Sequence, residues 1–262
     1  MSNVQQIFAH LKDRRAGVAD RPHPLVTHHL SPTGALFAHN DNELWVPTRD
    51  STAARPVKGR SSSHCVGALV DAGSNRAILF ESKLEAGLAK ILLADRTVAH
   101  LQDQAAPVTY VDRDGEVYRH FFDFIATKVD GRRVAYAVKP TAYVQSSGIK
   151  EKLALIRARH PGFVDQYVLA TEREITHRRT AHAEWILWAR RGRNDDDVRT
   201  LTPLAMGIKG TVPLRSLAEA SGLGPRAFCA IVCLIDEGVL RLAGREPLGD
   251  HALIQPNPDF SR

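Results

Sequence analysis

The chain has 262 residues, of which 44% are hydrophobic and 24% charged, ordinary proportions for a soluble globular protein. No run of about eighteen apolar residues occurs and the N-terminus has no apolar core of the signal-peptide type, so we expect a cytoplasmic protein without a membrane span. The formal net charge of +6 is compatible with a nucleic-acid partner but does not require one.

Composition divides the chain into three expected parts. Residues 1–54 are rich in Pro, Gly, Ser, Thr and His over most of their length and predict a partly flexible lead-in. Residues 55–172 carry most of the strand signals, and residues 173–262 turn helical. The second part begins with a basic, Ser-rich segment that is either a solvated loop or a phosphate-contacting arm, with Arg55, Lys58 and Arg60 as the candidate DNA contacts.

The first predicted element is a strand at residues 65–72, followed by a Gly-Ser-Asn turn. Residues 76–81 then lead into a helix. Ser82 suits the N-cap of this helix, and Glu85 stands three residues later, at the position of a capping box. Glu85 is therefore either a cap residue or a ligand. Which of Glu85 and Glu81 faces the neighbouring strands distinguishes the two interpretations.

The next elements are strands separated by two Asp-Gly hairpin turns, at Asp114–Gly115 and Asp130–Gly131. We expect one strand to run through residues 116–129 with Asp123 among aromatic residues, and the next to end near Lys139. A helix over residues 149–159 and a strand over 163–171 follow. The order predicts an α/β core with a mixed sheet covered by helices.

The order of predicted elements in the C-terminal part is typical of a winged helix-turn-helix. A helix at 214–220 and a Ser-Gly-Leu-Gly turn precede a second helix at 225–237, and short segments on either side of residue 250 suit two wing strands. Arg226 is the candidate DNA contact of the second helix, which otherwise carries few polar side chains. Direct DNA reading and protein contact both remain open. The expected packing positions are Ala218, Leu223, Phe228, Ile231 and Leu234.

Metal-dependent phosphodiester cleavage needs hard oxygen ligands for a divalent cation and a group that orients water or neutralises the phosphate. A helix-borne Glu85, Asp123 at a strand end and Lys139 on the neighbouring strand can converge in this way. The sequence therefore predicts a Mg²⁺ or Mn²⁺ site here. The structural alternatives are hairpin hydrogen bonding for Asp123 and a surface ion pair for Lys139.

A longer series of motifs resembles the N-terminal nuclease domain of the TnsA family, the cleavage subunits of heteromeric transposases in the PD-(D/E)XK, restriction-endonuclease-like superfamily. It comprises S-x-L-E (82–85), Gln104 with Pro107, F-D-F (122–124), D-G-R-R (130–133) and V-K-P (138–140), within residues 55–172. The resemblance implies a restriction-endonuclease-like core in which Glu85 and Asp123 hold the metal and Lys139 is the catalytic lysine. The carbonyl of Val138 is a further ligand candidate, and Gln104 a polar support.

The sequence departs from the motif at Ala137, where the family has Glu, Asp or sometimes Gln two residues before the lysine. Alanine offers no oxygen ligand. Either Glu81 or another carboxylate substitutes, or the enzyme uses fewer direct ligands, or the chain is a nuclease-inactive relative.

The first hypothesis is a DNA endonuclease that cuts double-stranded DNA at transposon ends in the bacterial cytoplasm, near the nucleoid. The resemblance implies a separate strand-transfer subunit and an ATPase as partners, and is compatible with an oligomer. The second hypothesis is a nuclease-inactive DNA-binding or regulatory protein on the same fold, whose DNA binding weakens steeply with salt without metal-dependent cleavage. The third is a protein-interaction adaptor, for which absence of DNA affinity at low salt is the sign.

Overall fold

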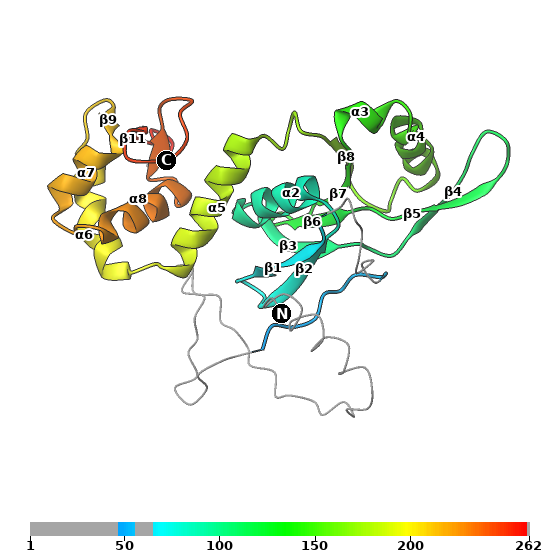
Figure 1. Ribbon diagram of the computed structural model, residues 1–262, viewed down its shortest axis with the longest axis horizontal. Coiled ribbons are helices and arrows are strands. Elements are labelled where there is room, and N and C mark those ends of the chain that lie inside the picture. The colour runs from blue at the N-terminus through cyan, green and yellow to red at the C-terminus, as the bar shows by residue number, and fades with distance from the viewer. Residues whose placement is uncertain (1–46, 56–64, 261–262) are drawn as a thin grey trace. The chain divides into compact units, whose positions relative to one another are not determined.

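The computed structural model describes residues 47–55 and 65–260, which form a mixed α/β structure with several sheets and seven helices in this part of the chain (Figure 1). The predicted α/β class is confirmed at this level. Most of the predicted lead-in, residues 1–46, lies outside the described residues, as do Lys58 and Arg60. No described helix is both long enough and apolar enough to cross a membrane.

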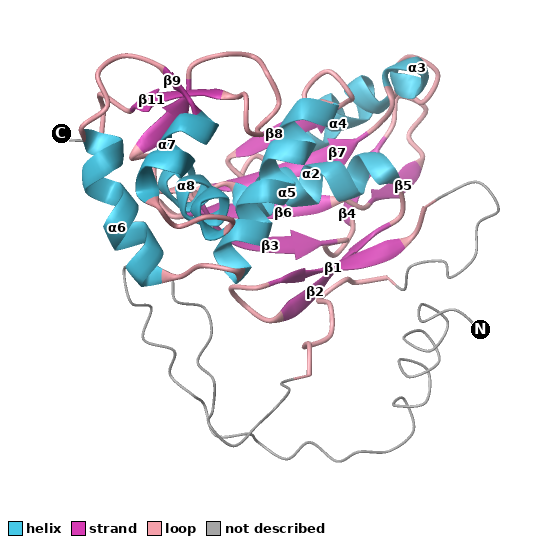
Figure 2. Ribbon diagram, turned by 60° about the vertical axis from the view of Figure 1, so that its left-hand side comes forward, coloured by secondary structure: helices cyan, strands magenta, loops and turns pink. Residues whose placement is uncertain are grey.

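A four-stranded mixed sheet forms the centre of the N-terminal part (Figure 2). Its order is β3 (Val98–Asp103), β6 (Phe124–Lys128), β7 (Arg133–Val138) and β8 (Gln166–Ala170). β3, β6 and β7 pair antiparallel, and β8 lies parallel to β7. The parallel pair requires a crossover, which α3 (Thr141–Val144) and α4 (Ile149–Arg159) supply.

Alternation along the strands gives this sheet two apolar faces. On one face, α2 (Lys83–Ala94) packs Leu88 and Leu92 against Phe124 of β6. On the other, α4 packs Ile149 and Ile156 against residues that include Ile125, one position further along β6. The sheet is therefore covered by a helix on each side, as the sequence pattern predicts.

Two hairpins extend this part of the chain. β1 (Gly67–Asp71) pairs with β2 (Arg76–Phe80), and β4 (Val108–Val111) pairs with β5 (Val117–His120). The predicted continuous strand over residues 116–129 is wrong, because it breaks at 121–123 into β5 and β6, which belong to different sheets. Asp123 therefore stands just before a strand begins.

The C-terminal part consists of α5 (His177–Arg191), α6 (Asp195–Met206), α7 (Leu214–Ser221) and α8 (Arg226–Asp236), followed by a small sheet. The helices predicted at 214–220 and 225–237 are confirmed as α7 and α8, to within one residue at each end. The sheet has the order β10, β11, β9, with antiparallel pairing throughout; its strands are β9 (Val212–Pro213), β10 (Leu240–Leu242) and β11 (Leu253–Pro256).

One apolar core holds the C-terminal elements together. Ile231 and Leu234 of α8 are fully buried in it, and Ala218, Leu223 and Phe228 pack against it partly buried, as predicted. α5 also packs along α2. Gly87 of α2 is needed here, because a Cβ there would lie 3.1 Å from Oγ1 of Thr180 in α5 and 2.8 Å from Cγ2 of Ile175, just before α5.

Candidate active site

Asp123 is fixed by main-chain hydrogen bonds to both neighbouring strands. Its N–H donates to the carbonyl oxygen of Tyr136 (3.0 Å), and its carbonyl oxygen accepts the N–H of Gln104 (3.0 Å). Its side chain is half-buried, and Oδ2 accepts the N–H of Val138 at 2.7 Å. No described residue donates to Oδ1. The hydrogen-bonding role predicted for Asp123 is thus confirmed for Oδ2, and Oδ1 is left for a ligand.

The end of β7 directs Val138 and Lys139 to different neighbours. The N–H of Lys139 donates to the carbonyl of Ala170 on β8, at 3.0 Å. Successive residues of a strand present their main-chain groups to opposite sides, so the N–H and carbonyl of Val138 both face the β6 side. Its N–H already bonds the Asp123 carboxylate there. The Val138 carbonyl therefore points toward the edge at which Asp123 lies, as a metal ligand there would require.

Glu85 approaches the site from the first turn of α2 and does cap the helix. Oγ of Ser82 accepts the N–H of Glu85 (3.1 Å), and its own hydroxyl donates to Oε1 of Glu85 (2.9 Å). Oε2 of Glu85 accepts the N–H of Glu81 (2.7 Å). Glu85 as a residue is 9% exposed, and each of its carboxylate oxygens retains a second lone pair. Capping and ligand roles are compatible in this geometry.

The charge of Glu85 acts on the ionisation of Asp123. Burial, followed by the charge of Glu85, raises the pKa of Asp123 to about 7, against the opposing effects of the Val138 N–H, Lys139 and Arg55. Burial also raises the pKa of Glu85, with Glu81 adding to the shift while hydrogen bonds and Arg55 oppose it. Both carboxyl groups therefore lose their protons less readily than exposed acids do.

Arg55 supplies positive charge beside this pair. Its Nε donates to Oε1 of Gln104 and one terminal nitrogen donates to Oε2 of Glu81, both at 2.7 Å. Its guanidinium carbon lies 5.4 Å from the ring centroid of Phe121. Arg55 is thus held by residues from three segments, and Glu81 is occupied by this ion pair.

Gln104 is a strained and buried support. It is 1% exposed and has a φ of 41°, in the left-handed region that side chains rarely adopt. Its Nε2 is buried without a partner among the described residues. Such strain and an unmet donor are features that concentrate at functional sites.

Ala137 lies on the α4 face of the sheet, 2% exposed, in the apolar cluster that includes Phe122 and Ile149. A carboxylate at this position would be buried among apolar side chains, and the alanine fills the space instead. Within residues 47–55 and 65–260, no three His, Cys, Asp or Glu side chains gather as a metal site. Substitution of the missing ligand by a third carboxylate is therefore not found among the described residues.

The residues present nevertheless fit Mg²⁺. Mg²⁺ is commonly held by one or two carboxylates together with waters and substrate phosphate oxygens. Glu85 and Asp123 supply two carboxylates, and the Val138 carbonyl a third hard oxygen. Lys139, half-buried after β7, has no acidic partner within 4.0 Å among the described residues, so the predicted surface ion pair is wrong.

The remaining predicted contact, Arg226, begins α8 and is 64% exposed in its side chain. It forms an ion pair of 3.2 Å with the buried Asp197 of α6. The sequence interpretation passed over His120, a half-buried residue whose pKa is lowered to about 4 by burial and then by the charges of Lys152 and Lys139. It belongs to no motif, so no signal in the sequence indicates it.

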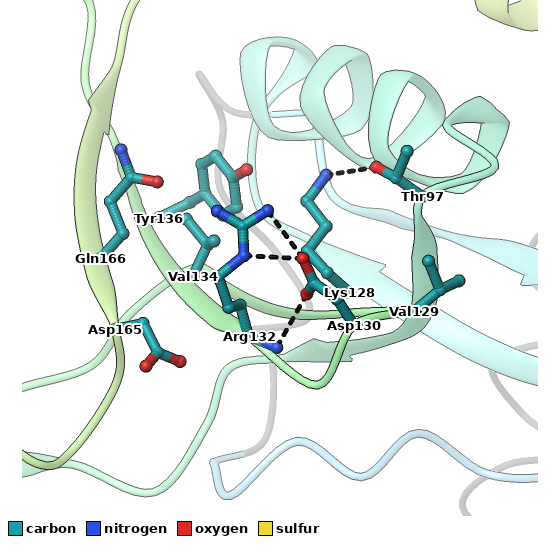
Figure 3. A pocket seen from close by; sticks show the side chains of 9 residues that line it. All are labelled: Thr97, Lys128, Val129, Asp130, Arg132, Val134, Tyr136, Asp165 and Gln166. Atoms are coloured by element: carbon teal, nitrogen blue, oxygen red, sulfur yellow. Dashed lines mark hydrogen bonds and ion pairs between the residues drawn. The ribbon is translucent and has the colours of Figure 1, made fainter.

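A cavity of about 570 Å³ opens at the opposite end of β6 and β7 (Figure 3). Its charged groups bond to protein neighbours: Arg132 to Asp130 at 2.7 Å, and Lys128 to Asp95 at 2.8 Å. It contains none of the site residues described above. Its lining is Thr97, Lys128, Val129, Asp130, Arg132, Val134, Tyr136, Asp165 and Gln166.

No protein-family model matches the chain, and a search of curated proteins returned no match.

Proposed function

We propose that this chain is a metal-dependent DNA endonuclease of the TnsA type, which hydrolyses a phosphodiester bond in duplex DNA as part of a transposition system. One observation carries the proposal. Glu85 comes from a helix, Asp123 from the start of one strand and Lys139 from the end of the next. The charges of Glu85 and Lys139 both act on the ionisation of Asp123. Perturbed carboxyl groups with a nearby lysine are typical of catalytic sites.

The order of elements supports a restriction-endonuclease-like core. α2 is followed by three antiparallel strands, then α4, then a strand parallel to the third. In the same way, the succession of α7, α8 and the antiparallel β10 and β11 supports a winged-helix module in the C-terminal part.

Each residue has a distinct task in the proposed reaction. Glu85, Asp123 and the Val138 carbonyl would hold the Mg²⁺ or Mn²⁺, which when bound lowers the pKa of water and stabilises charge on the phosphate. Asp123 gives up its proton to bind, because its pKa lies near 7. The Val138 N–H keeps its carboxylate oriented. Lys139, without an acidic partner of its own among the described residues, neutralises the phosphate or orients the water.

The proposed function implies a DNA substrate and protein partners. The substrate is double-stranded DNA in the bacterial cytoplasm, and the proteins acting beside the nuclease would be a strand-transfer subunit and an ATPase. The winged-helix module would contact either DNA or a protein.

The second candidate function is a nuclease-inactive DNA-binding or regulatory protein on the same fold. The apolar burial of Ala137 and the ion pair that occupies Glu81 favour it, because they leave only two carboxylates for the metal. It predicts salt-sensitive DNA binding and no metal-dependent cleavage.

A plasmid-nicking assay separates the two. Wild-type protein, Asp123→Ala and Lys139→Ala are incubated with supercoiled DNA and either Mg²⁺, Mn²⁺ or EDTA, with Lys150→Ala as an exposed-lysine control. The nuclease proposal predicts metal-dependent nicking by the wild type and the control only. Equal cleavage by all four proteins, or none by any of them in the presence of DNA binding, contradicts it.

A further inference from the structure

A second cavity, of about 560 Å³, is formed by the end of α2 together with α5 and β10. It shares no lining residue with the candidate active site. Part of its lining is apolar and includes Ile91 of α2, Ile186 of α5, and Leu240 and Leu242 of β10. Small-molecule sites usually enclose about 300–1,000 Å³ and are largely apolar, so this cavity has the size of such a site.

Three arginines bring positive charge to the same cavity. Arg178 and Arg179 lie in the first turn of α5, Arg241 lies in β10, and all three are exposed. Among the described residues, none of the three forms an ion pair within 4.0 Å. The one acidic residue in the described lining, Asp95, is already paired with Lys128 at 2.8 Å. The charge of the three arginines is therefore not balanced by a carboxylate of the described residues.

The guanidinium groups are held by neutral acceptors. Arg178 and Arg179 each donate to a main-chain carbonyl, at 3.4 and 2.5 Å. The amide oxygen of Gln255, opposite Arg241 on β11, accepts two bonds from its guanidinium at 2.7 and 2.6 Å, in the orientation that also satisfies Thr211. A guanidinium has five N–H donors, so most of the donors of each arginine remain for a ligand.

The position of Arg178 and Arg179 also favours an anion. The first turn of a helix is the positive end of its macrodipole, where negative charge is stabilising and positive charge is not. The first turn of α5 contains these two arginines and no acidic residue. An anion bound in the cavity would offset this accumulation of positive charge.

Two further side chains of the lining, His182 and Asn257, supply neutral hydrogen-bonding groups. Both residues are half-buried. Burial, and then the charge of Arg178, lower the pKa of His182 below its usual value of 6.5, so its imidazole is neutral at pH 7. A neutral imidazole and an amide each offer a donor and an acceptor, as recognition of a sugar or a base requires.

We propose that this cavity binds a small organic phosphate of the mononucleotide class, with its phosphate held by Arg178, Arg179 and Arg241 and its base or sugar against the apolar lining. A terminal phosphate presents three oxygens to the three guanidinium groups, whereas a carboxylate presents two. The backbone of a DNA duplex would bring a phosphate to the arginines and leave the apolar lining uncovered. The inference goes beyond the proposed nuclease function and does not depend on it.

Isothermal titration calorimetry of the full chain in EDTA tests the site. The ligands are adenosine 5′-monophosphate, uridine 5′-monophosphate and inorganic phosphate, compared at constant ionic strength. The wild type should bind at least one of the nucleotides, and more tightly than it binds inorganic phosphate. Arg178→Ala and Arg241→Ala should each weaken nucleotide binding by about tenfold or more, because each removes charge-assisted hydrogen bonds. Arg191→Ala, an exposed arginine at the other end of α5, is the matched control and should bind as the wild type does.

Leu242→Ala tests the apolar lining. It should weaken nucleotide binding and leave the affinity for inorganic phosphate unchanged. The ratio of the two affinities reports the contact even where the substitution lowers the fraction of folded protein.

Absence of nucleotide binding by the wild type would overturn the inference, as would equal losses in Arg241→Ala and Arg191→Ala. Equal affinities for nucleotide and inorganic phosphate, or a ratio that Leu242→Ala does not change, would reduce the cavity to a site for free phosphate and overturn it as well. Displacement of the nucleotide by duplex DNA would assign the arginines to a nucleic-acid backbone, which also contradicts the inference.

Discussion

Two carboxylates of this chain, Asp236 and Asp123, are both affected by burial but have opposite ionisation behaviour. Asp236 ends α8 with a side chain that is only 4% exposed, yet its pKa lies below the usual value. Asp123, between β5 and β6, has a pKa raised to about 7. Burial raises both values, so the difference lies in the partners that each carboxylate has.

Asp236 is fully compensated by arginines. Arg190 donates to both of its oxygens, at 2.8 and 2.7 Å, and Arg96 donates to one at 2.9 Å. Arg190 also donates to the carbonyls of Leu93 and Ala94, at the end of α2. This ion-pair network joins α2, α5 and α8, which makes Asp236 a structural residue.

Asp123 has no cation at hydrogen-bonding distance among the described residues, only the Val138 N–H. Lys139 and Arg55 act on it from further away, and the nearby Glu85 works against its ionisation. Burial alone therefore does not mark a functional acid. A buried acid that the fold leaves without a cation is the one expected to take a cation from solution.

The largest expected effect is on stability, at the structural acid. Asp236→Ala leaves Arg190 buried without its partner and should lower the free energy of unfolding by ~3–5 kcal/mol. Asp123→Asn should not destabilise the protein, because it removes an unfavourable buried ionisation. Urea unfolding at pH 7 measures both. Equal destabilisation by the two substitutions would contradict the distinction between a structural Asp236 and a non-structural Asp123.

The second effect is the pH dependence of stability. Asp123 has a pKa of about 7 when folded and near 3.8 when unfolded, so its contribution is complete below pH 3.8 and lost as pH rises toward 7. His120, with a lowered pKa, contributes the opposite trend between about 4 and 6.5. The difference in unfolding free energy between Asp123→Asn and wild type isolates the contribution of Asp123. This difference should grow from pH 4 to 7 and then stay constant. A difference that shrinks with pH would contradict the raised pKa.

The smallest effect concerns Arg55, whose charge is the last of the causes acting on Asp123. Arg55→Ala should raise the pKa of Asp123 slightly, because a nearby positive charge is removed. Carboxyl-carbon NMR titration measures the shift, with Arg132→Ala, at the other end of the strands, as control. An unchanged or lowered value would show that Arg55 does not act on the acid pair.

The sequence predicted the regular elements well where local signals are strong. Ser82 marks the start of α2 through its cap, and the expected helix at 149–159 matches α4. The sequence gives no Gly or Pro turn signal for the break at 121–123, where Asp123 alone interrupts a run of aromatic and β-branched residues. Its cause is tertiary: Phe122 packs into the α4 cluster while Asp123 bonds to β7.

The candidate site was predictable only where a motif covers it. Glu85, Asp123 and Lys139 follow from spacing and from the resemblance. The contacts of Arg55 with Gln104 and Glu81 join residues 49 and 26 positions apart, and nothing local indicates them.

The most direct test of the central claim, that the Glu85 and Asp123 pair binds a divalent cation, is Mn²⁺ titration followed by electron paramagnetic resonance. The wild type, Glu85→Gln, Asp123→Asn and the control Asp130→Asn are compared at pH 6 and pH 8. The account predicts a site in the wild type and control that is lost in the other two, with tighter binding at pH 8 because Asp123 must lose its proton. Binding that survives Asp123→Asn, or a wild type that binds no Mn²⁺ at pH 8, would contradict it.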